Sequence, residues 1–219
     1  MTRREESQKH AIAAIKHVRA ALPFGSDNRK YDHKNLEAMK RIDLAQKEVA
    51  VLPNNLLNTA KIAEIFQNQQ AGNCQAQCSC AFAFLSGQTG VSIQLCTIEK
   101  LNHVFLIIND DLICDPWLPC IHSLDDFQEY MKMVLDCMPN KSVEGIERGI
   151  SKNPGFSAED IIIMDSVPIS TGASLQKLKK TISGKLQGFF VRKPTLSGCE
   201  LPPDAVTVNG FTVCNVINQ

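Results

Sequence analysis

The chain turns at Gly72-Asn73-Cys74 and continues to residue 85 as Gln-Ala-Gln-Cys-Ser-Cys-Ala-Phe-Ala-Phe-Leu. Small or apolar side chains occupy nearly every side of this run, which predicts a buried helix over 74–85. Gly72-Asn73 is a turn pair, so Cys74 is expected in the first helical turn. Backbone N–H groups without intrahelical partners and the helix dipole favour a thiolate at that position.

Helical spacing of apolar residues dominates the chain before Gly72. Segments 5–22, about 35–50 and about 55–67 are predicted to be helices. We therefore expect a helical N-terminal region over 1–68 and a core domain over 69–219, the two forming one compact unit.

Short β-branched segments follow the helix that carries Cys74. Strands are predicted at 91–98, 103–108 and 112–114, with residues 109–111 as a hairpin turn between the last two. The remaining elements are expected at 123–138 (helix), 161–164 (strand), 173–187 (helix), 188–192 (strand) and 206–213 (hairpin). The sum is an α+β fold, with a helical N-terminal part and then a Cys-bearing helix packed on a mainly antiparallel sheet.

The helix expected at 123–138 has a predicted start signal. Ser123 and Asp126 stand in capping-box spacing, and an amphipathic pattern follows them. We therefore expect this helix to begin directly after Ser123.

Composition excludes several classes of function. Lys and Arg together number 23, as do Asp and Glu, so the chain has no basic excess that would indicate nucleic-acid binding. No apolar run has the length of a membrane span, and the charged start carries no apolar signal region, so we expect cytosolic synthesis without a signal peptide. The nine cysteines are odd in number and mostly embedded in apolar runs, which indicates buried thiols rather than a disulfide framework.

Cys74, His103 and Asp115 form the candidate site. His103 opens a predicted strand and Asp115 closes the next one. With a three-residue loop at 109–111, Ile108 faces Leu112, and the histidine and aspartate lie diagonally on one face of the hairpin. In that register Asp115 orients the imidazole, and His103 holds Cys74 as a thiolate. A two-residue loop would place the pair on opposite faces.

The order Gly-Asn-Cys, then Asn-His-Val-Phe-Leu-Ile-Ile, then Ile-Cys-Asp-Pro-Trp resembles the transglutaminase-like branch of the papain-like cysteine enzymes, especially bacterial effector-type members. The likeness covers about residues 70–118. It implies a papain-like or transglutaminase-like fold and acyl transfer through a thioester, with Cys74, His103 and Asp115 as the catalytic triad. The family often supplies an oxyanion-binding amide just before the cysteine, and Gln69 is our choice among residues 67–70.

The resemblance implies a hydrolase or acyltransferase that acts on an amide of a protein substrate. Protease, glutamine deamidase and transglutaminase remain equal alternatives at this point, and no cofactor or metal is expected. The helical N-terminal part is a candidate docking surface for the substrate. Effector-type relatives also favour delivery into a host cell by a specialised secretion system.

Three other interpretations stay open. The first is a non-enzymatic binding module of the same fold. The second is a zinc protein that uses Cys74, Cys78, Cys80 and His103. The third is a redox-responsive protein in which Cys74 pairs with Cys78. The zinc interpretation is weakened by spacing, because a helix directs Cys78 and Cys80 about 200° apart.

Overall fold

The computed structural model of the chain describes residues 2–29, 35–53, 58–98, 101–138 and 156–169, together with the backbone of 206–208 and 211–213. The described helices are α1 (Arg3–Ala21), α2 (Leu36–Ala50), α3 (Thr59–Gln69), α4 (Cys74–Leu85) and α5 (Phe127–Cys137), with 3-10 turns at Leu124–Asp126 and Ala158–Asp160. The described strands are β1 (Ile93–Ile98), β2 (Leu101–Ile108), β3 (Leu112–Asp115), β4 (Cys120–Ser123), β5 (Ile161–Val167), β6 (Val206–Val208) and β7 (Phe211–Val213). The helix expected at 173–187 and the strand expected at 188–192 lie outside the described residues.

Local sequence signals account for the starts of the N-terminal helices. Thr2 forms a capping box with Glu5 at the start of α1, and the side chains of Asn35 and Asn58 accept backbone N–H groups at the starts of α2 and α3. The three helices predicted in this part of the chain are confirmed, with ends that differ by a few residues.

Five strands form one sheet in the order β4-β3-β2-β1-β5, and all four neighbouring pairs are antiparallel. The prediction of an α+β protein with an antiparallel sheet is therefore confirmed. Strand β4 was not predicted, because Cys-Ile-His-Ser is too short and too mixed to give a strand pattern. Strands β6 and β7 pair with each other, as the hairpin prediction for 206–213 required.

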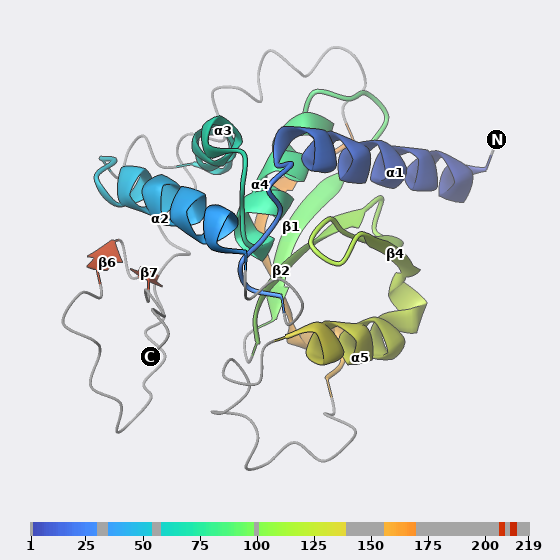
Figure 1. Cartoon of the computed structure of the whole chain (residues 1–219). Coiled ribbons are helices and arrows are strands. Elements are labelled where there is room, and N and C mark those ends of the chain that lie inside the picture. The colour runs from blue at the N-terminus through green and yellow to red at the C-terminus, as the bar shows by residue number, and fades with distance from the viewer. Residues whose placement is uncertain are drawn as a thin grey trace.

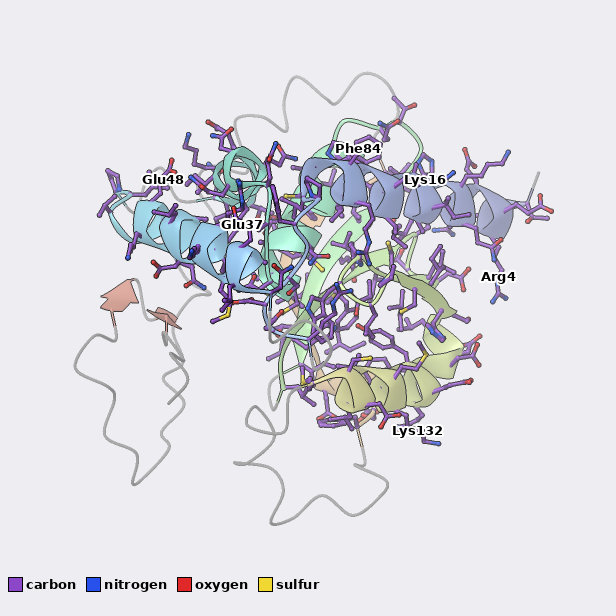
Figure 2. All side chains as sticks on the ribbon, viewed as in Figure 1. Arg4, Lys16, Glu37, Glu48, Phe84 and Lys132 are labelled. Carbon is purple, nitrogen blue, oxygen red and sulfur yellow. The ribbon has the colours of Figure 1, made fainter. Side chains whose placement is uncertain are left out.

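The sheet separates two hydrophobic clusters, as the alternation of β2 side chains requires. Val104, Leu106 and Ile108 belong to a cluster that includes residues of α1 to α4, whereas Phe105 and Ile107 belong to a cluster with α5. Figure 1 shows α5 across the sheet from the N-terminal helices. Side chains fill the layer between α5 and the sheet, and the exposed Lys132 projects from the outer side of α5 (Figure 2).

The predicted capping box at Ser123 is wrong. Ser123 ends β4, where it pairs with Leu112, and its side chain makes no capping hydrogen bond. A 3-10 turn follows, and the α-helix begins only at Phe127. The backbone of Ser123 is thus paired within the sheet, and the α-helix begins at Phe127 rather than directly after Ser123.

Candidate active site

Cys74 is the first residue of α4, as predicted. Asn73 is the N-cap, and its side-chain oxygen accepts the backbone N–H of Ala76 at 3.0 Å. The Cys74 side chain is 5% exposed. The cysteine therefore lies where the first-turn N–H groups of the helix converge and where little water reaches the sulfur.

The chain before Cys74 packs against a loop from the N-terminal part. The N–H of Gly72 donates to the carbonyl of Gly25 at 2.9 Å, and the N–H of Phe24 donates to the carbonyl of Gln70 at 3.1 Å. A Cβ atom on Gly72 would lie 2.6 Å from the Cβ of Ala76, so only glycine fits there without displacement. These contacts fix where α4 begins.

The hairpin of β2 and β3 has the predicted register. Ile108 pairs with Leu112, and Leu106 pairs with Cys114. His103 and Asp115 consequently lie on one face, and His103 Nε2 is 2.8 Å from Asp115 Oδ2, with both side chains 0% exposed. The structure thus brings these two predicted site residues together.

Asp115 accepts four hydrogen bonds. Its Oδ1 accepts the backbone N–H groups of Trp117 at 2.9 Å and Leu118 at 3.1 Å. Its Oδ2 accepts the hydroxyl of Tyr130 at 3.0 Å, in addition to the ring N–H of His103. Because a carboxylate is an acceptor at both oxygens, this pattern requires that Nε2 of His103 carries a proton.

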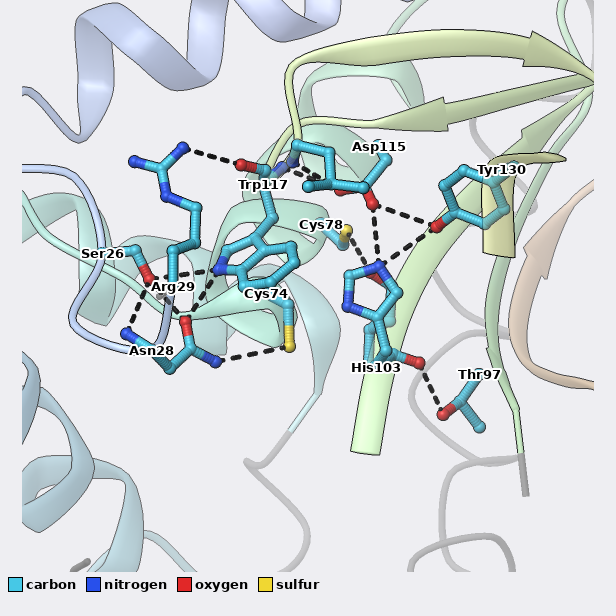
Figure 3. Close-up of polar contacts among 12 residues, drawn as sticks. Ser26, Asn28, Arg29, Cys74, Cys78, Thr97, His103, Asp115, Trp117 and Tyr130 are labelled. Carbon is cyan, nitrogen blue, oxygen red and sulfur yellow. Dashed lines mark hydrogen bonds and ion pairs between the residues drawn. The ribbon is translucent and has the colours of Figure 1, made fainter. Parts of the chain in front are cut away.

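The other ring nitrogen of His103, Nδ1, lies on the side of Cys74 (Figure 3). It is buried and has no nitrogen or oxygen partner within the described part of the chain. Burial lowers the pKa of His103, but the charge and hydrogen bond of Asp115, with smaller contributions from Cys74, raise the pKa to about 10. The imidazole is therefore arranged to carry positive charge beside the sulfur.

Four residues around the candidate site were not predicted to take part in it. Tyr130 comes from α5, and its hydroxyl lies 3.1 Å from His103 Nε2. Trp117 is 1% exposed, with its ring centroid 5.0 Å from that of His103. Ser26 and Asn28 come from the loop after α1, and Asn28 Nδ2 is 3.9 Å from Cys74 Sγ. The sequence around Ser26, Asn28 and Tyr130 contains no signal for these contacts, because each depends on packing between distant segments. Trp117 differs, since it ends the motif Ile-Cys-Asp-Pro-Trp that also carries Asp115.

Gln69 is half-buried in the last turn of α3, and its backbone carbonyl accepts from Arg41 at 3.3 Å. No described contact joins its side chain to Cys74. The amide that does approach the sulfur belongs to Asn28.

Cys78 and Cys80 point into the core. The thiol of Cys78 donates to the carbonyl of Val104 at 3.1 Å, and the thiol of Cys80 donates to the carbonyl of Ala63 at 3.6 Å. Burial raises the pKa of both thiols, that of Cys80 to about 12. Among the described residues, no group of three or more His, Cys, Asp or Glu side chains is arranged to hold a metal ion.

The chain is thus an α+β protein in which a helix-opening cysteine lies beside a buried His–Asp pair. Residues 32–138 match the model of a family described as the Dot/Icm T4SS effector Ceg10. No curated protein matches the chain. The family match supports a bacterial effector that is translocated into host cells. Within the described residues, no helix is long and apolar enough to cross a bilayer.

Proposed function

We propose that the chain is a cysteine-dependent acyl-transfer enzyme of the papain-like or transglutaminase-like type, which acts on an amide of a host protein. The observation that carries this proposal is the buried contact of 2.8 Å between His103 Nε2 and Asp115 Oδ2, next to a cysteine that opens a helix. Nothing in the name of the matching family specifies an activity, so the chemistry rests on this geometry.

The proposed reaction begins with the sulfur of Cys74. The thiolate attacks the carbonyl carbon of the amide, a C–S bond forms, and the carbonyl π electrons move to oxygen. When the intermediate collapses, the C–N bond breaks, and His103 transfers its Nδ1 proton to the leaving amine. Asp115 keeps Nε2 protonated throughout, so that Nδ1 is the nitrogen that exchanges the proton.

The group that attacks the remaining thioester determines the product. Water regenerates the thiol and completes proteolysis if the amide was a peptide bond, or deamidation if it was a glutamine side chain. A second amine would instead give a transglutaminase product. Translocation into a host cell, which the family match supports, makes host proteins the substrate class of this proposal.

Comparison of host-cell extracts treated with wild type or with Cys74→Ala tests the proposal. Quantitative peptide mass spectrometry would score new peptide termini, deamidated glutamines and amine-linked glutamines. We expect one of these three products to appear with wild type only, and its type assigns the reaction. Identical extracts from the two treatments would contradict an acyl-transfer function. Cys80→Ala is the matched control, since that thiol lies in the core away from His103.

A further inference from the structure

The loop after α1 brings an amide to the sulfur of Cys74 from 46 residues earlier in the chain. Asn28 Nδ2 lies 3.9 Å from Cys74 Sγ, and Asn28 is half-buried. Neither the residue pattern nor the family match, which begins at residue 32, includes this loop. Figure 3 shows Asn28 between Trp117 and Cys74.

Trp117 determines which end of the Asn28 amide faces the sulfur. The indole Nε1 is 2.8 Å from Asn28 Oδ1, and an indole N–H is only ever a donor. The amide atom at that contact must therefore be the oxygen. The hydroxyl of Ser26 also donates to Oδ1, at 2.5 Å. The amide NH2 group is consequently fixed in the direction of Cys74.

We propose that Asn28 supplies the side-chain donor that stabilises the oxyanion formed when Cys74 attacks a carbonyl. This assignment rests on the acyl-transfer function proposed above. The backbone N–H of Cys74, in the first turn of α4, is the second donor in this proposal, and the N–H of Ala76 is bonded to Asn73. When the C–S bond forms, the carbonyl electron pair moves to oxygen, and the two N–H groups hydrogen-bond the new charge.

The short segment from Asp115 to Trp117 positions both His103 and Asn28. Asp115 holds His103 through Nε2, and Trp117, two residues later, holds Asn28 through Oδ1. The backbone N–H of Trp117 also donates to Asp115 Oδ1, and the carbonyl of Trp117 accepts from Arg29 at 2.9 Å. The turn after β3 thereby fixes the positions of the general base, His103, and the oxyanion donor, Asn28, relative to each other.

Two reactions of Cys74 distinguish the loss of an oxyanion donor from a general loss of Cys74 reactivity. Alkylation by iodoacetamide displaces iodide at a tetrahedral carbon and forms no oxyanion. Acetylation by p-nitrophenyl acetate passes through an oxyanion and releases p-nitrophenolate. Rates of both reactions at Cys74 are measured by peptide mass spectrometry for wild type, Asn28→Ala and the similarly shaped Asn28→Leu. Asn68→Ala, which removes an exposed amide on α3, is the matched control.

Both Asn28 variants are expected to lose acetylation on the order of 100-fold more than they lose alkylation, the scale of one missing oxyanion donor. Asn68→Ala is expected to match wild type in both reactions. Equal loss in the two reactions, or no loss in either, would overturn the assignment while leaving the Cys–His–Asp proposal intact. Wild type that is not acetylated at Cys74, or is acetylated equally well as His103→Ala, would overturn the proposed function and this assignment with it.

Discussion

At the scale of single residues, Asp115 fixes the geometry of the site, because its carboxylate accepts hydrogen bonds from His103, from Tyr130 and from two backbone N–H groups. Two backbone N–H groups fix Oδ1, and His103 and Tyr130 meet at Oδ2. A carboxylate held on both oxygens cannot rotate, so the imidazole it holds is fixed as well. Tyr130 donates to the same Asp115 oxygen that orients His103, so Tyr130 is a positioning residue.

Removal of the Tyr130 hydroxyl is expected to be costly. Tyr130→Phe deletes a buried hydrogen bond to a charged acceptor and should lower the free energy of unfolding by about 1.5–3 kcal/mol in urea titration. Ser123→Ala is the control, since that buried hydroxyl has no hydrogen-bond partner among the described residues and its loss should change stability little. If both variants unfold at the same urea concentration, the Tyr130 hydroxyl contributes nothing to the pair.

The residues that carry the site were predictable to different degrees. Cys74 stands at a helix start and Asp115 at a strand end, whereas His103, predicted to open its strand, is the third residue of β2, which begins at Leu101. The site still followed from local patterns and one register argument, because the pairing of Ile108 with Leu112 is as predicted. Asn28 and Tyr130 stand at no such boundary. Their contacts arise from how a loop and a helix pack on the sheet, which local sequence does not encode.

At the scale of elements, the start of α4 is the feature on which the site depends. Its predicted bounds, 74–85, match the structure because the Gly-Asn turn and the apolar run mark both ends. The antiparallel hairpin of β2 and β3 was likewise predictable from the loop at 109–111. The start of α5 was not, because the pairing of β4 with β3 overrides the capping signal at Ser123.

Gly72→Ala should disturb this helix start. The new Cβ would lie 2.6 Å from the Cβ of Ala76 and 3.2 Å from Cδ1 of Leu22, so the turn before Cys74 must move. We expect a loss of about 1–3 kcal/mol in unfolding free energy, together with slower alkylation of Cys74. Gly87→Ala is the control, because its Cβ would meet only Phe84 O at an ordinary 3.7 Å. Unchanged stability in Gly72→Ala would show that the turn is not tightly packed.

At the scale of the whole molecule, the N-terminal helix is part of the core rather than an appended surface. Ala11, Ala14 and Val18 are at most 1% exposed and belong to the same cluster as residues of α4 and the sheet. Deletion of residues 1–50 would therefore remove core packing and the Asn28 loop together. The docking role considered for this part of the chain is better tested by changing exposed charges such as Lys16.

The pH dependence of global stability follows from His103. The folded pKa, raised to about 10, lies above the ordinary value of 6.5. The stability that the histidine contributes is thus fully present below about pH 6.5 and is lost as the pH rises toward 10. We expect the difference in unfolding free energy between wild type and His103→Gln to shrink over this interval. Buried thiols such as Cys80 are present in both proteins, so their contribution cancels in this difference. A difference in unfolding free energy that does not change with pH would exclude a cationic His103.

Activation of Cys74 by His103 is tested by alkylation with iodoacetamide from pH 5 to 9. Cys120 is an internal reference, since it is more exposed than Cys74 but its pKa is raised by burial and by Asp115. We expect Cys74 to react before Cys120 near pH 6 in wild type, despite its lower exposure, and we expect this preference to disappear in His103→Ala. Slow labelling of Cys74 with the pH profile of an ordinary thiol, equal in the two proteins, would show that His103 does not activate Cys74.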